Sequence, residues 1–301
     1  NRYPDPLQLE VKKKLSKIKK VTTKQIFLGN GSDEAIDLVF RIFCQPGIDN
    51  VVAISPTYGM YQVAADINDV SYRAVQLDDD FKLNADKLLQ ATDANTKVLF
   101  LCSPNNPSGN NLDKQEIEKL LTSFDGIVVI DEAYIDFSSD ISYSKQLDKF
   151  PHLIILQTLS KAWGAAGIRL GMAYASDAII RLFNKVKYPY NVNQLSQEYA
   201  LKLLGKITER RKQVKEILDE LKRMDEELRK FPFVLKVYPS DANFLLVKVQ
   251  DANGLYSFLS EQGVIVRNRH KVILCEGCLR ITIGTPEENK RLMHELKKYQ
   301  P

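Results

Sequence analysis

Short, mostly apolar runs alternate with amphipathic segments over roughly the first 175 residues of the chain. The apolar runs are short enough for buried strands and lie at residues 25–28, 51–54, 72–75, 97–102, 126–130 and 153–156. Between them, apolar side chains recur at helical spacing, for example over residues 7–20 and 113–121. Continuously apolar strands that alternate with helices predict an α/β fold, in which helices sandwich a mostly parallel central sheet.

The pattern changes after about residue 174. Residues 206–231 carry apolar side chains at helical spacing in a heavily charged background, which predicts one long amphipathic helix. Short alternating strands follow at about 234–238, 243–249, 264–267 and 279–283, with helices at about 254–262 and 287–299. We therefore predict a large domain over residues 1–187 and a smaller C-terminal α+β domain over residues 188–301, which includes the linking helix.

Composition excludes several classes of protein. The chain has 301 residues, enough for two domains, and a net charge of only +4, which argues against a nucleic-acid partner. No apolar run reaches the length of about 18 residues that a membrane span needs, so we expect no membrane partner. The four cysteines do not form a disulfide-rich pattern, which favours a cytoplasmic setting. The C-x-x-C at residues 275–278 stands alone and lacks the second pair of a zinc ribbon.

Polar and reactive side chains follow the predicted strands at the points where the strands end. The carboxyl ends of parallel strands line one edge of a sheet, and ligands bind outside that edge. We therefore expect one site to contain the groups that stand there, which are the small-residue turn at 29–34, Tyr58, Asn106, Asp131, Tyr134, Ser160 and Lys161.

One ligand uses all of these groups, namely pyridoxal 5′-phosphate. A lysine amine forms a Schiff base with its carbonyl, and a carboxylate keeps its ring nitrogen protonated. The first turn of a helix donates backbone N–H groups to its phosphate, while an aromatic side chain packs on the ring. The sequence therefore predicts pyridoxal 5′-phosphate as the cofactor.

Each of these signals has an ordinary structural explanation when it is taken alone. Asp131 could cap a turn, Tyr58 could belong to the core, and Lys161 could be an exposed loop lysine. The strand that ends at Asp131 also suits the metal-binding strand of an ATPase, but no G-x-x-x-x-G-K-[ST] run occurs. The three histidines lack metal-ligand spacing, so no metal is expected. Only the conjunction of the signals favours a catalytic site.

Several motifs resemble those of a known family. The segment Ser-Pro-Asn-Asn-Pro-Ser-Gly at 103–109, Asp-Glu-Ala-Tyr at 131–134, and Ser160-Lys161 followed by the segment 167–171 are similar to the fold-type I aminotransferases. Segments 2–4, 31–34, 56–61 and 277–282 more narrowly resemble the histidinol-phosphate aminotransferases within that family. The resemblance covers essentially the whole chain. The family's N-terminal arm, with its Asn-Glu-Asn-Pro-like motif, does not occur in the sequence, and we expect it to be either removed or disordered.

The resemblance implies a role for each matching residue around the cofactor. Lys161 is expected to be the Schiff-base lysine and the proton carrier. Asp131 is expected to pair with the ring nitrogen, Tyr134 and Asn106 with the ring hydroxyl, and Tyr58 with the ring face. Phosphate ligands are expected to be the backbone of Ser32 and Asp33, the side chains of Ser160 and Arg169, and Tyr3 of a neighbouring subunit. A homodimer with shared active sites follows from the last of these.

The resemblance also implies the substrates. Arg280 is expected to bind the carboxylate of glutamate, and Arg267 the phosphate of histidinol phosphate, although Arg269 is an alternative. The implied reaction is transamination between histidinol phosphate and 2-oxoglutarate in histidine biosynthesis, which yields imidazole-acetol phosphate and glutamate. An aromatic aminotransferase and a threonine-phosphate decarboxylase share nearly all of these motifs. A cofactor-sensing regulator is a third alternative, but no DNA-binding module is visible in the sequence.

Overall fold

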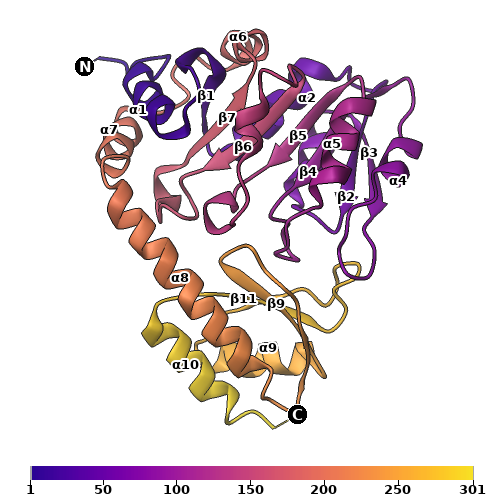
Figure 1. Ribbon diagram of the computed structural model, residues 1–301, viewed down its shortest axis with the longest axis vertical. Coiled ribbons are helices and arrows are strands. Elements are labelled where there is room, and N and C mark those ends of the chain that lie inside the picture. Colours follow the sequence, from indigo (N-terminus) through magenta and orange to yellow (C-terminus); the bar gives the residue numbers. More distant parts are fainter. Residues whose placement is uncertain (1, 301) are drawn as a thin grey trace.

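The computed structural model describes residues 2–300, which form two units joined by one long helix (Figure 1). The larger unit contains a seven-stranded sheet in the order β1-β7-β6-β5-β4-β2-β3. Its strands are β1 (Ile26–Asn30), β2 (Asn50–Ser55), β3 (Ser71–Gln76), β4 (Thr96–Cys102), β5 (Ile127–Asp131), β6 (Leu153–Thr158) and β7 (Leu170–Ala175). Six of these strands confirm the apolar runs of the sequence, and β7 was not predicted as a strand.

The sheet is mostly parallel, as expected, with one exception. β7 pairs antiparallel with both β1 and β6, because residues 159–169 return the chain from the end of β6 along the edge of that strand. β2, β3, β4, β5 and β6 pair in parallel, so their carboxyl ends share one edge. That common edge brings together the loops on which the predicted site residues lie.

Helices cover both faces of this sheet. One face packs against α1 (Leu9–Lys19), α4 (Ala85–Gln90), α5 (Lys114–Ser123) and α7 (Gln194–Leu203), and the other against α2 (Ser32–Phe43), α3 (Met60–Ile67) and α6 (Asp177–Val186). Helix α4 was not among the helices expected from the sequence. It is short, and Asn84 caps it by accepting a hydrogen bond from the backbone N–H of Lys87.

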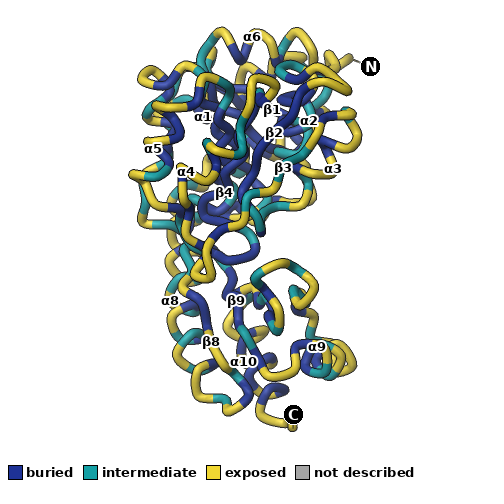
Figure 2. Tube along the Cα trace, turned by 90° about the vertical axis from the view of Figure 1, so that its right-hand side faces the viewer, coloured by how far each residue is buried: buried dark blue, intermediate teal, exposed yellow. Residues whose placement is uncertain are grey.

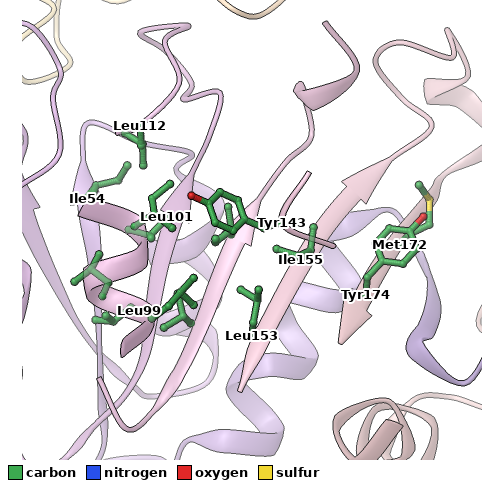
Figure 3. Packing of buried hydrophobic residues seen from close by; sticks show 14 of the residues in the cluster. Ile54, Leu99, Leu101, Leu112, Tyr143, Leu153, Ile155, Met172 and Tyr174 are labelled. Atoms are coloured by element: carbon green, nitrogen blue, oxygen red, sulfur yellow. The ribbon is translucent and has the colours of Figure 1, made fainter. Parts of the chain in front are cut away.

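Strand side chains alternate between two apolar layers. Leu99, Leu101, Leu153 and Ile155 point into the first layer (Figure 3), while their neighbours Phe100 and Ile154 point into the second. All six are fully buried, and each buried side chain of this size contributes roughly 1.5–3 kcal/mol. Figure 2 shows β1, β2 and β4 in the buried centre of this unit, whereas the edge strand β3 is partly exposed.

The smaller unit contains a four-stranded antiparallel sheet in the order β10-β11-β9-β8. Its elements are β8 (Val234–Val237), β9 (Phe244–Val249), α9 (Ala252–Glu261), β10 (Arg267–Asn268), β11 (Cys278–Thr282) and α10 (Pro286–Leu296). The strand expected at 264–267 is reduced to the two residues of β10. The reason is that the N–H of Val264 bonds to the carbonyl of Leu259 in α9 and is lost to the sheet.

Helix α8 (Ile207–Leu228) runs from the larger unit to the smaller one and confirms the long amphipathic helix (Figure 1). The preceding α7 packs beside α1, and Ala200 lies in the core of the larger unit. The division at residue 187/188 itself stays a prediction.

Three further features bear on the classes of protein considered from the sequence. All four cysteines are free and buried, including Cys275 and Cys278, which close a tight turn. Residues 2–300 hold no cluster of side chains that could bind a metal ion. No helix in this part of the chain is long and apolar enough to cross a membrane.

Candidate active site

A cavity of about 460 Å³ opens at the carboxyl edge of the large sheet and faces the small unit. Every site residue named from the sequence, with the exception of Tyr3, lines it, and so does Arg269. The lining residues include Ser32, Asp33, Tyr58, Asn106, Asp131, Tyr134, Ser160, Lys161, Arg169, Arg267 and Arg280. The fold therefore brings into one cavity groups that lie up to 248 positions apart in the sequence, from Ser32 to Arg280.

The first turn of α2 forms one end of the cavity. Gly31 precedes the helix with a φ of 77°, and a Cβ there would lie 2.6 Å from Nη2 of Arg169. The guanidinium of Arg169 also lies 3.3 Å from the carboxylate of Asp33, on the first turn. Backbone N–H groups at a helix start and an adjacent arginine make an anion-binding cradle. Ser160, whose hydroxyl bonds to that of Thr158 at 2.9 Å, lies on the same wall.

Asp131 ends β5 in the floor of the cavity and is only 3% exposed. Its carboxylate accepts hydrogen bonds from the hydroxyl of Tyr61 at 2.9 Å and from the N–H of Ala133 at 3.0 Å. Burial raises the pKa of Asp131 to about 6, although these two hydrogen bonds and the charge of Lys161 act in the opposite direction. A buried carboxylate with unused lone pairs suits the positively charged nitrogen of a ring.

Lys161 lies in the turn after β6, and its Nζ is 5.3 Å from the centre of the Tyr134 ring. The turn is closed by a 2.9 Å bond from the N–H of Gly164 to the carbonyl of Lys161. The side chain is open to the cavity, yet the surrounding protein and then the guanidinium of Arg280 lower the pKa of Lys161. An amine with a lowered pKa is a better nucleophile and base near neutral pH.

Tyr58 and Tyr134 supply the aromatic and phenolic groups. The hydroxyl of Tyr58 donates to the carboxylate of Asp33 at 3.0 Å, which fixes the ring above the start of α2. Tyr134 is held edge-on against Phe244 of β9, with the ring centres 5.1 Å apart. Burial raises the pKa of Tyr134 to about 12, so its hydroxyl stays a hydrogen-bond donor.

Three arginines of the small unit form the opposite wall. Arg267 and Arg280 are direct partners across the β10–β11 pair, and Arg269 follows on the same loop. Within residues 2–300 none of the three has an acidic partner in a salt bridge. Like charges opposite one another on a sheet are unfavourable, so this wall suits an anionic ligand.

Arg280 is the most enclosed of the three. It lies over the ring of Phe244 at 4.8 Å and donates a hydrogen bond from Nη1 to Oδ1 of Asn106 at 2.6 Å. Its Nε is buried without a hydrogen-bond partner in the described chain, and burial lowers the pKa of the guanidinium. Arg269 is half-buried, whereas Arg267 is exposed.

Tyr61 donates a hydrogen bond to Asp131 but was not identified from the sequence as a site residue. The sequence signal that could have indicated it is its position three residues after Tyr58, at the start of a helix.

Tyr3 lies outside the cavity and is 78% exposed, stacked on Tyr190 with ring centres 4.4 Å apart. The role expected for Tyr3 concerns a neighbouring subunit and stays a prediction.

Comparison with known proteins identifies the family. The model of the family "Aminotransferase class I and II" matches residues 1–296, and the chain belongs to this family. It is 58% identical over 300 residues to the histidinol-phosphate aminotransferase of Bacteroides thetaiotaomicron, covering 100% of this chain and 87% of that protein. It is 60% identical over 297 residues to the histidinol-phosphate aminotransferase of Parabacteroides distasonis, covering 99% and 86%. The narrower resemblance seen in the sequence is thereby confirmed.

Solved structures agree with the fold. The histidinol-phosphate aminotransferase of Clostridium acetobutylicum has a TM-score of 0.91 at 25% identity, and covers 99% of this chain and 90% of that one. The enzyme of Sinorhizobium meliloti, solved in complex with pyridoxal 5′-phosphate, has a TM-score of 0.90 at 20% identity, with 99% and 82% covered. The L-threonine-O-3-phosphate decarboxylase of Porphyromonas gingivalis shares the fold as well, with a TM-score of 0.82 at 22% identity and 99% and 88% covered.

Proposed function

We propose that this protein is a pyridoxal-phosphate-dependent transaminase that exchanges an amino group between histidinol phosphate and 2-oxoglutarate in histidine biosynthesis. The observation that carries the proposal is a single cavity with an anion cradle at one end, three arginines at the other and Lys161 between them. The high identity to histidinol-phosphate aminotransferases over nearly their whole length supports this substrate.

The residues present fit the cofactor. A Cβ at Gly31 would fill the space in front of the first turn of α2, so glycine keeps this space open. Arg169 lies beside it and supplies the positive charge that a phosphate requires. We assign the phosphate to the first turn of α2, Ser160 and Arg169, the ring nitrogen to Asp131, and the ring hydroxyl to Asn106 and Tyr134. When bound, pyridoxal phosphate supplies a carbonyl for the amine and a ring that accepts the electron pair of a substrate carbanion.

Lys161 performs the proton transfers in this proposal. Its amine would hold the carbonyl carbon of the cofactor until a substrate amine displaced it. The freed amine would carry a proton from the substrate Cα to the reacting carbon of the cofactor. The lowered pKa of Lys161 supports this role, because a base must be largely unprotonated near its working pH.

The arginine wall binds and orients the two substrates. We assign the carboxylate of glutamate or 2-oxoglutarate to Arg280, whose planar guanidinium can donate two parallel hydrogen bonds. The phosphate of histidinol phosphate is assigned to the pair formed by Arg267 and Arg269. One wall thus accepts two substrates whose anionic groups differ in distance from the reacting amine.

We further propose a homodimer with shared active sites. Exposed aromatic and leucine side chains occur before and at the start of α1, between α6 and α7, and within α7, namely Tyr3, Leu9, Tyr188, Tyr190, Leu195 and Tyr199. A second copy that covers these side chains would bury apolar surface, and it would bring Tyr3 toward the neighbouring phosphate cradle. Four free cysteines support the cytoplasmic setting that we propose.

The decisive experiment is a substitution of Lys161. Purified wild-type protein loaded with pyridoxal phosphate is expected to be yellow, to bleach with histidinol phosphate and to recover its colour with 2-oxoglutarate. Lys161→Ala is expected to lose multiple-turnover transamination. Lys24→Ala, an exposed lysine outside the cavity, is the matched control. Sustained turnover by Lys161→Ala would refute the proposal.

A second assay separates the alternatives that share this fold. Half-reactions with histidinol phosphate, phenylalanine and threonine phosphate are compared on the same preparation. Bleaching by phenylalanine alone would indicate an aromatic aminotransferase, and loss of carbon dioxide from threonine phosphate a decarboxylase. Cofactor binding without any half-reaction would indicate a regulator.

A further inference from the structure

Tyr61 lies close to the cavity, but it is not one of the residues that line it. It is the second residue of α3 and is fully buried, with 0% of its surface exposed. Its hydroxyl donates a hydrogen bond of 2.9 Å to Oδ2 of Asp131, from behind the floor of the cavity. The other carboxylate oxygen, Oδ1, accepts from the backbone of Ala133 at 3.0 Å.

The ring of Tyr61 is held on two sides by aromatic side chains. It stacks on Phe100 of β4 with ring centres 4.8 Å apart and meets Tyr58 edge-on at 5.7 Å. Phe100 in turn stacks on Phe40 of α2 at 5.4 Å. This column fixes the position of the hydroxyl, so that the direction of the hydrogen bond to Asp131 is set by packing and does not depend on a mobile side chain.

A fully buried tyrosine does not need a partner of this kind in this protein. Tyr174 in β7 is equally buried, and its hydroxyl has no hydrogen-bond partner among residues 2–300. Packing of the ring is therefore enough to bury a tyrosine in this protein, and a hydrogen bond from its hydroxyl is not required. The hydroxyl of Tyr61, in contrast, donates to a buried carboxylate, and the thiol of Cys102 lies beside it.

The surroundings of Asp131 explain what this hydrogen bond does. Asp33 acts on its charge from the first turn of α2 and Lys161 from the turn after β6, and the hydroxyls of Tyr58 and Tyr134 and the thiol of Cys102 also face it. Burial, the largest effect, favours the protonated acid and raises the pKa of Asp131 to about 6. Tyr61 and the N–H of Ala133 are the two donors that favour the carboxylate.

We propose that Tyr61 is a positioning residue, which holds Asp131 as an oriented carboxylate toward the ring nitrogen of the cofactor; this inference rests on the proposed function. Without the hydroxyl, Asp131 keeps one of its two donors and binds its proton more tightly. The proton shared with the ring nitrogen then shifts toward Asp131, and the ring loses positive charge. A ring with less positive charge is a weaker acceptor of substrate electrons.

The test compares Tyr61→Phe with Tyr174→Phe, each of which removes one hydroxyl from a fully buried ring. Affinity of the apoenzyme for pyridoxal phosphate is expected to fall about tenfold or more in Tyr61→Phe, as befits a lost hydrogen bond to a charged group, and to stay unchanged in Tyr174→Phe. The pH midpoint at which the absorption band of the loaded enzyme changes is expected to rise in Tyr61→Phe only. In an Asp131→Asn background, the effect of Tyr61→Phe on affinity is expected to shrink.

Three results would overturn the inference. The first is a Tyr61→Phe enzyme with wild-type affinity and a wild-type pH midpoint. The second is an equal loss of affinity from Tyr61→Phe in the wild-type and Asp131→Asn backgrounds. The third is a loss of melting temperature from Tyr61→Phe that is the same in the wild-type and Asp131→Asn apoenzymes, which would show that the hydroxyl does not act through Asp131. Failure of the proposed function is distinct, because the wild-type protein itself would then show no cofactor band.

Discussion

Nη1 of Arg280 and Oδ1 of Asn106 lie 2.6 Å apart, and this hydrogen bond joins β11 of the small unit to the loop after β4 of the large one. The two residues are 174 positions apart in the sequence. The same guanidinium packs over Phe244 of β9. The small unit thus delivers a substrate-binding group to the cofactor-binding unit, and the cavity is complete only with both.

Replacement of Arg280 by lysine tests this relationship. Arg280→Lys keeps the positive charge but loses the planar fork that can bond Asn106 and a carboxylate together. We expect KM for 2-oxoglutarate to rise about tenfold or more, with a smaller change in the affinity for pyridoxal phosphate. Steady-state kinetics measure the first and equilibrium titration the second. Arg223→Lys, on the outer face of α8, is the matched control, and an unchanged KM in Arg280→Lys would contradict the assignment.

Arg267 and Arg269 are distinguished by their burial. Arg269 is half-buried and faces Tyr134, whereas Arg267 is exposed, and solvent screens an exposed charge more strongly. We expect Arg269→Ala to raise KM for histidinol phosphate more than Arg267→Ala does. Neither should alter KM for 2-oxoglutarate as much as Arg280→Lys. A larger effect of Arg267→Ala would reverse the ranking.

Gly171 controls how closely β7 approaches the start of α2. A Cβ at this position would lie 2.1 Å from the backbone nitrogen of Ser32 and 2.3 Å from the carbonyl carbon of Gly31. Main-chain atoms cannot swing away, so Gly171→Ala is expected to lower the free energy of unfolding by at least about 2 kcal/mol and to weaken cofactor binding. Urea unfolding of the apoenzyme measures the first effect.

Gly167 is the control for this substitution. A Cβ there would meet nothing within 4 Å. We therefore expect Gly167→Ala to leave stability unchanged or to raise it by up to about 1 kcal/mol, since alanine restricts the unfolded chain. Equal stability of the two variants would show that the approach of β7 to α2 is not tight.

Asp131 makes the stability of the apoenzyme depend on pH. Its pKa rises from an ordinary value of 3.8 to about 6 on folding, so the native state binds the proton more tightly than the unfolded state does. The buried charge of Asp131 does not change the free energy of unfolding below about pH 4, where the carboxyl is protonated. As the pH rises the charge lowers the free energy of unfolding, by about 3 kcal/mol at most above about pH 6. Asp131→Asn removes the titrating group and keeps an oxygen for the hydroxyl of Tyr61.

We therefore expect the Asp131→Asn apoenzyme to be more stable than wild type at pH 7.5, as the cost of a buried charge disappears. The difference should vanish as the pH falls toward about 4. Urea unfolding of both apoenzymes across this range measures it. A difference that is independent of pH would show that the carboxyl of Asp131 does not titrate in this way.

The sequence predicted the sheet and most of the site because both depend on local patterns. Apolar runs marked the buried strands, and their ends marked the loops that carry Asp131, Asn106 and Lys161. Strand β7 and its antiparallel direction were not predicted, although residues 170–175 are as buried as the parallel strand β6 beside them. Strand direction depends on how the turn after Lys161 returns the chain, which hydrophobicity does not encode.

The sequence by itself determined which chemical groups are present and which end of each strand they follow, because periodicity and turn residues act over a few positions. Only the tertiary structure decided which groups meet. It placed Tyr61 behind Asp131, brought Arg280 to Asn106, and buried Arg269 more deeply than Arg267. These relationships arise from packing between elements distant in the chain, where distances of a few ångströms set hydrogen bonds and the cost of charge burial.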